Sequence, residues 1–300
     1  MKQIAIIGPT ASGKSDLAIE TALRHNANIL SIDSLSIYKE IDIASAKPDA
    51  EALAKVKHFG INEIDPDAHF SVAIFIELYQ KALRQTREEE KNLIIVGGTS
   101  FYLKSLTTGL SELPEYSRQT KERTAKMLSD LQQAYAYLRE RDPAYMRAIE
   151  PTDAYRIEKM LLLVLESGMS PTEWFNAHPP RPVIEKLDIF DIEVDRTLLR
   201  ERIIKRTRKM VGSGLIDEVA MLEQKYGRDH NAMKAIGIVE VLAFLDGECS
   251  KEEMIDTIIT HTAQLAKRQQ TFNRTQFSEA VPAELNVLPQ LIADLFSKQE

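Results

Sequence analysis

The sequence has almost no cysteine and no long apolar run. Cys249 is the only cysteine among 300 residues, so the chain forms neither a disulfide framework nor a cysteine-based metal site, as expected in a reducing compartment. No apolar run approaches the roughly 20 residues that a helix needs to cross a bilayer. Because Met1-Lys2-Gln3 leads at once into an apolar strand, we expect no signal peptide, a cytoplasmic location and no membrane partner.

Strong positive charge is also absent. The net charge is −7 and the pI is near 5.6, which argues against nonspecific coating of nucleic acid. Lysine and arginine nevertheless cluster at residues 200–209 and 267–274, so a local nucleic-acid site stays open. A hydrophobic content of 44% beside 28% charged residues is typical of a globular protein, large enough here for a core and a smaller second domain.

Short apolar strands alternate with amphipathic helices in the first part of the chain. We predict strands at 4–7, 28–32, 93–96 and 187–194, and helices at 15–25, 72–90 and 100–107. This alternation indicates an α/β fold in which helices flank a parallel sheet. Further helices are predicted after the last strand, at 197–211, 216–225, 238–245 and 251–272.

Between residues 111 and 184 the pattern is helical only. We predict helices at 117–141 and at 153–167, the second capped by Thr152 and ended by Gly168. These residues are therefore predicted to form a helical insertion domain between core segments 1–110 and 185–300.

A glycine-punctuated loop follows the first strand and opens the first helix. Its residues are Gly8, Pro9, Thr10, Ala11, Ser12, Gly13, Lys14 and Ser15. The glycines let backbone N–H groups converge on one point, the helix N-terminus adds a positive dipole, and Lys14 adds a full charge. This pattern at residues 8–15 is that of a P-loop. It therefore predicts a polyphosphate site, with the hydroxyl of Ser15 suited to Mg²⁺.

Asp33 is the candidate catalytic base. It follows the second strand, and the carboxyl ends of strands line the ligand crevice of an open α/β sheet. A carboxylate there can take a proton from a nucleophile that attacks the bound phosphate ester. The alternative is that Asp33 only starts a turn, because Asp-Ser is common in turns.

The strand at 93–96 ends without an acidic residue. Gly97-Gly98-Thr99 stands where motor-type nucleotide hydrolases place the acid that holds Mg²⁺, which disfavours a work-producing ATPase. The glycines allow close approach of a ligand, and Thr99 is suited to cap the following helix. A plain tight turn explains these three residues equally well.

Two groups of basic residues are candidate sites for phosphate or RNA. Arg202 and Arg206 share one helix face that suits a departing diphosphate, although the same pattern is common on solvated helices. Residues 264–274 interleave basic, amide and aromatic side chains, a mixture that holds RNA backbone and stacks bases. A charged helix end accounts for that segment as well.

Taken together and in this order, the motifs resemble bacterial tRNA dimethylallyltransferases over nearly the whole chain. Besides the loop at 8–15, the matching residues are Asp33-Ser34 with Tyr38, Asp42-Ile43 with Ala46-Lys47-Pro48, Gly97-Gly98-Thr99, Ile149, Pro151, Asp153, Arg156 and Ile157, Arg202 and Arg206, Met210, Gly214-Leu215 and Glu218, Ala235-Ile236-Gly237 with Glu240, and Ala266-Lys267-Arg268-Gln269. The combination is specific although each motif alone is not.

The resemblance implies transfer of a dimethylallyl group from its diphosphate to the N6 amine of the adenine just 3′ of the anticodon in tRNA. The P-loop, including Thr10, then holds the diphosphate rather than ATP, Mg²⁺ lies near Ser15, Arg202 and Arg206 neutralise developing charge, and Asp33 is the general base. The resemblance also makes the insertion domain a candidate tRNA contact. It assigns contacts with the tRNA anticodon loop to Asp33, Ser34, Leu35, Ser36, Arg156, Lys159, Lys267 and Arg268. We expect the enzyme to act as a monomer.

Other functions remain open on the sequence alone. A P-loop beside a strand-end aspartate also fits a small-molecule kinase, and a nucleotide-dependent RNA-binding module would need no transfer chemistry. A free nucleotide is an alternative acceptor, although the insertion favours a large one. Many relatives carry Gln where Ser36 stands, so the sequence departs from the family pattern at this position.

Overall fold

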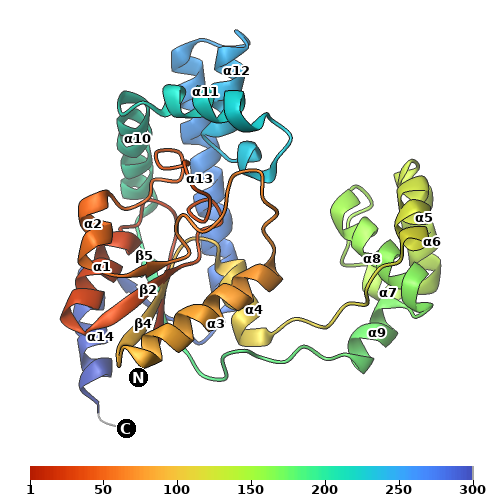
Figure 1. Ribbon diagram of the computed structural model, residues 1–300, viewed down its shortest axis with the longest axis horizontal. Coiled ribbons are helices and arrows are strands. Elements are labelled where there is room, and N and C mark those ends of the chain that lie inside the picture. The colour runs from red at the N-terminus through yellow and green to blue at the C-terminus, as the bar shows by residue number, and fades with distance from the viewer. Residues whose placement is uncertain (299–300) are drawn as a thin grey trace. The chain divides into compact units, whose positions relative to one another are not determined.

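Six parallel strands form the core sheet of the computed structural model, which describes residues 1–298 (Figure 1). They are β1 (Gln3–Ile7), β2 (Ala27–Ser31), β3 (His58–Phe59), β4 (Asn92–Val96), β5 (Asp188–Glu193) and β6 (Val281–Glu284), in the order β3-β2-β4-β1-β5-β6. The predicted α/β fold with a parallel sheet is confirmed. β3 and β6 were not predicted, because β3 has only two residues and β6 is largely exposed and contains a proline.

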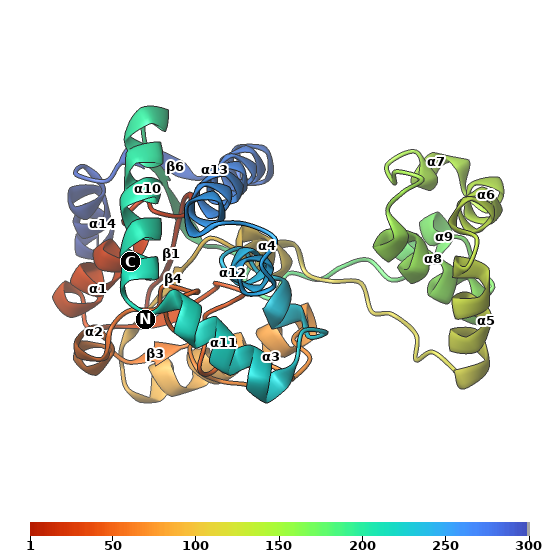
Figure 2. The same ribbon diagram turned by 90° about the horizontal axis from the view of Figure 1, so that it is seen from above.

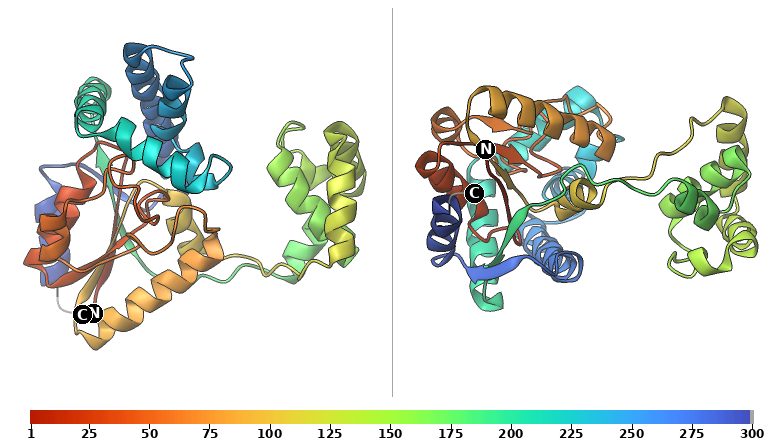
Figure 3. Two further views of the ribbon diagram at one scale, coloured as in Figure 1. Left: turned by 45° about the horizontal axis from the view of Figure 1, so that its top comes forward. Right: turned by 90° about the horizontal axis from the view of Figure 1, so that it is seen from below.

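Helices cover both faces of this sheet (Figures 2 and 3). On one face, α1 (Lys14–Arg24) and α14 (Leu288–Ser297) pack against apolar side chains of β1, β2 and β4. On the other face, α3 (Val72–Glu88) contacts β2 and β4 and buries Phe75 and Tyr79. Strands covered on both sides read as continuous apolar runs, which is why β1, β2 and β4 were recognisable in the sequence.

The core contains further helices besides α1, α3 and α14. They are α2 (Ala50–Lys55), α4 (Ser100–Thr108), α10 (Arg196–Gly212), α11 (Leu215–Tyr226), the 3₁₀ helix η1 (Asn231–Lys234), α12 (Ile238–Leu245) and α13 (Lys251–Gln276). The long helix α13 packs against both α10 and α12. In residues 1–298, no helix combines the length and the apolar character that membrane crossing requires.

The sheet brings several loops to one edge. Ile6 pairs with Val96, Ile7 with Asp191, and Ser31 with Val96, all in parallel. The P-loop after β1, Asp33 after β2 and Gly97 after β4 therefore leave the sheet at the same edge, where α/β proteins bind ligands.

Residues 108–183 form a compact helical unit, separate from the unit made of 1–107 and 184–300. Its helices are α5 (Arg118–Leu128), α6 (Leu131–Arg141), α7 (Pro143–Met146), α8 (Ala154–Ser167) and α9 (Pro171–Ala177). Its own buried cluster includes Leu138, Met146, Ile157 and Leu161. The unit therefore has a hydrophobic core independent of the sheet.

Two details of this helical unit differ from the sequence prediction. The single helix predicted at 117–141 is two helices, because Asp130 leaves the helical conformation and its carboxylate accepts from Gln133 N at 2.9 Å, which starts α6. The cap of α8 is Asp153 rather than Thr152. The Asp153 carboxylate accepts from Arg156 N at 3.0 Å.

Candidate active site

The P-loop turns sharply between β1 and α1. Gly13 stands before the helix with a φ of 95°, in the left-handed region that glycine adopts without steric cost. Ala11 is also left-handed, with a φ of 62°. Ser12 N donates to Pro9 O at 3.2 Å, which closes the turn. The first N–H groups of α1 lack carbonyl partners within the helix and so offer an anion site.

The Lys14 side chain is buried in this loop. Its ammonium donates to Pro9 O at 2.8 Å. Burial lowers the pKa of Lys14 from 10.5 to about 8, with the negative charge of Asp33 opposing the shift and the positive charge of Arg206 adding to it. An anion bound beside Lys14 would restore the favourable environment that the buried ammonium lacks.

Asp33 both starts a turn and faces the site. Its Oδ1 accepts from Leu35 N at 3.0 Å, the geometry of an Asx turn. Among residues 1–298, its Oδ2 accepts no hydrogen bond and stays available to a ligand. The hydroxyl of Thr99 accepts from Ser34 N at 3.1 Å, so Thr99 fixes the loop after β2 with the side chain that the sequence suggested as a helix cap.

A cavity of about 520 Å³ opens beside Asp33. Thr10, Arg206 and Gln269 also line it, and the rest of the wall is largely apolar. The larger apolar residues are Leu35, Phe101, Ile203, Met210, Ile236, Ile258, Leu265 and Phe272. A smaller space of about 70 Å³ shares Thr10, Asp33, Arg206 and Gln269 with this cavity and adds Lys14 and Ser15. The two spaces therefore adjoin, and together they offer a polar end and an apolar chamber.

Helix α10 brings two arginines to the P-loop, whereas their spacing in the sequence predicts only that they share one helix face. Arg202 Nη1 donates to Ser12 O at 3.2 Å, and Arg206 lines both cavities one helical turn later. Burial lowers the pKa of the Arg206 guanidinium, and Asp33 opposes that shift. Leu199 and Ile203 are buried beside them and hold the helix in place. Arg202, Arg206 and Lys14 also line a groove of about 1000 Å³ on the outer side of the P-loop.

Gln269 of α13 ties two of the loops together, a role that the sequence did not reveal. Its Oε1 accepts from Thr10 N at 2.8 Å, and its Nε2 donates to Gly98 O at 3.0 Å. A Cβ on Gly98 would lie 2.4 Å from that Nε2, so the amide needs the glycine. The matching run at 266–269 was the only signal for this residue, because its partners are far away in the sequence.

Asp191 is a second carboxylate near the P-loop that sequence reasoning missed. It lies in β5 opposite Ile7, and its Oδ1 accepts from Asn273 Nδ2 at 3.0 Å. Burial raises the pKa of Asp191, and the positive charge of Lys14 acts in the opposite direction. Asp191 lies inside β5, whose sequence mixes charged and apolar residues, so no local pattern marked it.

The residues predicted to contact tRNA lie in several places. Ser34, Leu35 and Arg268 line the 520 Å³ cavity, whereas Ser36 is buried beside the smaller space. Lys267 lines a different groove, because adjacent residues of a helix point about 100° apart.

The two predicted tRNA contacts on α8 belong to the helical unit. Arg156 Nη1 forms an ion pair with Asp153 at 2.9 Å. Lys159 Nζ lies 5.4 Å from the ring centre of Tyr155, whose side chain is largely exposed. Both basic side chains therefore belong to a surface that also offers an aromatic ring, but their contact with tRNA stays a prediction.

The oxygen donors at the P-loop fit Mg²⁺ only in combination with a bound diphosphate. Ser15 is exposed, and its hydroxyl has no hydrogen-bond partner within residues 1–298. The same residues contain no group of three or more His, Cys, Asp or Glu side chains that could hold a metal ion. Mg²⁺ commonly uses few protein ligands and completes its octahedron with phosphate oxygens and water.

Comparison with known proteins identifies the family. A model of the IPP transferase family matches residues 36–276. The chain belongs to this family. The tRNA dimethylallyltransferase of Sulfurimonas denitrificans is 58% identical over 292 residues, which cover 97% of this chain and 98% of that protein. That of Helicobacter pylori is 38% identical over 92% of this chain and 88% of its own. The resemblance seen in the sequence is confirmed.

Solved structures of IPP transferase relatives have the same fold. The tRNA isopentenylpyrophosphate transferase of Bacillus halodurans matches with a TM-score of 0.72 and 29% identity, covering 98% of this chain and 94% of that one. A eukaryotic dimethylallyltransferase that acts on tRNA matches with a TM-score of 0.84 and covers 98% of this chain and 77% of its own. Its identity of 23% makes this a likeness of fold alone.

Proposed function

We propose that the protein transfers a dimethylallyl group from dimethylallyl diphosphate to the N6 amine of the adenine 3′ of the anticodon in tRNA. One observation carries the proposal: the unpartnered Oδ2 of Asp33 and the Thr10 end of a P-loop line one cavity with a largely apolar wall. A base and a polyphosphate cradle thus face a chamber suited to a prenyl chain and a purine. Family membership favours this reaction over phosphoryl transfer by a small-molecule kinase.

The residues of the site suggest a direct displacement. The adenine N6 attacks the allylic carbon, a C–N bond forms, and the C–O bond to the diphosphate breaks with its electron pair leaving on the diphosphate. The N6 proton becomes acidic only as the new bond forms, and Asp33 Oδ2 accepts it. An ionised carboxylate suffices for so late a proton transfer.

Positive charge around the P-loop stabilises the departing diphosphate. Lys14, Arg202 and Arg206 converge there from α1 and α10, together with the N–H groups at the start of α1. Mg²⁺ held at Ser15 would add positive charge to the diphosphate oxygens. The apolar side chains in the cavity wall would shield the allylic carbon from water and so limit its hydrolysis.

The acceptor base must leave its stack to reach Asp33. Extruding a base costs roughly a few kcal/mol, which contacts elsewhere on the tRNA offset. Arg268 at the cavity and the basic side chains of α8 are the residues we assign to those contacts. We expect the enzyme to work on the anticodon loop as a cytoplasmic monomer.

The variant Asp33→Asn tests the assignment of the base. Asparagine keeps the Oδ1 acceptor of the Asx turn, so the loop should fold unchanged while the proton acceptor is lost. We expect kcat to fall about 10²- to 10⁴-fold, measured as N6-prenylated adenosine released from digested tRNA. Binding of tRNA should change by less than about twofold.

Asp67→Asn is the matched control, because Asp67 is exposed and has no hydrogen-bond partner in the described part of the chain. It should leave kcat unchanged. Near wild-type turnover of Asp33→Asn would overturn the role of Asp33. Failure of the wild-type protein to form any prenylated adenosine would overturn the proposed reaction itself.

A further inference from the structure

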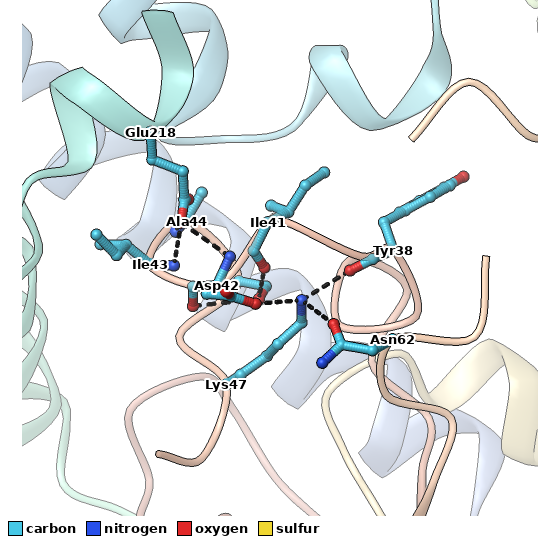
Figure 4. Close-up of polar contacts among 9 residues, drawn as sticks. Tyr38, Ile41, Asp42, Ile43, Ala44, Lys47, Asn62 and Glu218 are labelled. Carbon is cyan, nitrogen blue, oxygen red and sulfur yellow. Dashed lines mark hydrogen bonds and ion pairs between the residues drawn. The ribbon is translucent and has the colours of Figure 1, made fainter. Parts of the chain in front are cut away.

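The carboxylate of Glu218 fills a concave group of backbone amides. Glu218 lies in the first turn of α11 and accepts from the N–H groups of Asp42, Ile43 and Ala44 at 2.9, 2.7 and 2.9 Å (Figure 4). Three successive N–H groups that converge in this way form an anion site, and hydrogen bonds to an ionised acceptor are the strong ones. Here the protein supplies the anion from a helix more than 170 positions away in the sequence.

A second set of contacts fixes the same loop to the other end of α11. Lys225 Nζ donates to both carboxylate oxygens of Glu40, at 2.7 and 2.9 Å, and the Tyr226 hydroxyl donates to Glu40 Oε1 at 3.1 Å. Glu40 itself has a left-handed backbone, with a φ of 61°. Helix α11 therefore holds residues 40–44 at two points, one near each of its ends.

Inside the loop, Lys47 completes the arrangement. Its ammonium donates to Tyr38 O, Asp42 Oδ1 and Asn62 Oδ1, each at 2.7 Å (Figure 4). Only 3% of the Lys47 side chain is exposed. These bonds satisfy all three of its donors, so Lys47 is committed to holding the loop and is not a free cation for a ligand.

The loop that Glu218 holds forms part of the wall of the site. Ala44 and Ser45 line the 520 Å³ cavity, and Ser45 and Ala46 line the smaller space beside Lys14. Arg206 lines both of these spaces from α10. Because α10 and α11 are separated only by residues 213–214, Glu218 links the loop to the helix that carries the arginines.

We propose that Glu218 is a positioning residue for the transfer reaction. By binding the amides of residues 42–44, it sets the separation between the wall at 44–46 and the arginines of α10, and so the width of the space in which the diphosphate lies. The proposal rests on the proposed function, since it assigns that space to the diphosphate. If Glu218 positions the loop in this way, loss of its carboxylate should weaken diphosphate binding and turnover and leave tRNA binding intact.

The experiment compares Glu218→Ala and Glu218→Gln with Asp217→Ala. Asp217 is the matched control, because it occupies the same first turn with the same charge but is exposed and forms no hydrogen bond to the loop among residues 1–298. Glutamine keeps one acceptor oxygen for the amides. Glu218→Gln should therefore fall between wild type and Glu218→Ala, and it carries the test should the alanine variant fail to fold.

Three measurements distinguish positioning from general stability. In Glu218→Ala, hydrogen exchange at the amides of 42–44 should accelerate about tenfold or more. The Kd for inorganic pyrophosphate and the KM for dimethylallyl diphosphate should each rise about tenfold, kcat should fall, and the Kd for tRNA should change less than about twofold. Asp217→Ala should match wild type in all of these.

Unchanged amide exchange would overturn the proposal, and so would faster exchange with pyrophosphate Kd and KM still within about twofold of wild type. The second outcome would mean that Glu218 only stabilises the loop. If wild type forms no prenylated adenosine, the proposed function fails, but exchange and pyrophosphate binding still decide the role of Glu218.

Discussion

At the scale of single residues, Lys14 shows how burial adjusts a charge for its ligand. Its ammonium is held against Pro9 O in a space from which water is largely removed, and this burial lowers its pKa to about 8. In the free protein Lys14 is therefore charged at neutral pH but loses its proton slightly above it. A bound diphosphate stabilises the charged form of Lys14. Above the pKa of about 8, where the free lysine is mostly neutral, diphosphate binding is therefore coupled to the uptake of a proton by Lys14.

Diphosphate binding should consequently weaken as the pH rises. Below the pKa of about 8, Lys14 stays protonated and should add no pH dependence to the Kd for inorganic pyrophosphate. Near pH 9 the Kd should be about tenfold higher, because only about a tenth of the lysine is then protonated. Titration calorimetry between about pH 6.5 and 9.5 measures this.

Lys14→Arg is the control for this titration. An arginine keeps its charge throughout the range, so the rise near pH 9 should disappear while some affinity remains. Lys14→Met should bind weakly at every pH. A wild-type Kd that is flat up to pH 9.5 would show that Lys14 does not titrate near 8.

At the scale of elements, Gln269 connects helix α13 with loops from β1 and β4. Gln269→Ala removes two hydrogen bonds, to Thr10 N and Gly98 O, and should lower the free energy of unfolding by about 2 kcal/mol, measured by urea unfolding. It should also lower kcat/KM, because Thr10 lies in the P-loop. Gln270→Ala, at the next position and without such bonds in the described residues, is the control and should change little.

Gly98→Ala tests the same contact from the other side. The added methyl would lie too close to Gln269 Nε2 and would displace the end of that side chain. The double variant Gly98→Ala/Gln269→Ala should therefore lose little more stability than either single variant, because the two single variants break the same contact. Fully additive losses in this cycle would contradict the coupling.

What the sequence could predict about these elements depends on the range of the interactions. The P-loop, the Asx turn of Asp33 and the face of Arg202 and Arg206 arise from residues close together in the chain, and the sequence located each of them. The β1, β2 and β4 strands were recognisable because burial on both faces leaves continuous apolar runs.

Other features depend on partners that only the fold brings near. The amides that Glu218 binds and the two loops that Gln269 joins leave no local signature, because a backbone N–H or C=O is present at every position. The split of the predicted helix at 117–141 is of a different kind. Asp130 is compatible with both a helix interior and a cap, and the packing of α5 and α6 against α8 decides between them.

At the scale of the whole molecule, the chain consists of two units that are joined at neighbouring points. The core ends at Thr107 and resumes at Ile184, and Ile184 N donates to Leu106 O at 3.0 Å. The two connections therefore leave the core side by side, and each unit has its own buried cluster. Inserted units of this kind are commonly removable, because few contacts of the core depend on them.

Replacing residues 108–183 with a short Gly-Ser linker should leave a folded core that still binds pyrophosphate. We expect its pyrophosphate Kd to stay within about twofold of wild type, since Lys14, Arg202 and Arg206 all belong to the core. Its affinity for tRNA should fall about tenfold or more, because the basic side chains of α8 are lost. In the full-length protein, the double variant Arg156→Ala/Lys159→Ala should lose part of the same affinity for tRNA, with pyrophosphate binding unchanged. Wild-type tRNA affinity in the deletion variant would instead assign recognition to the core, where Arg268 lines the cavity.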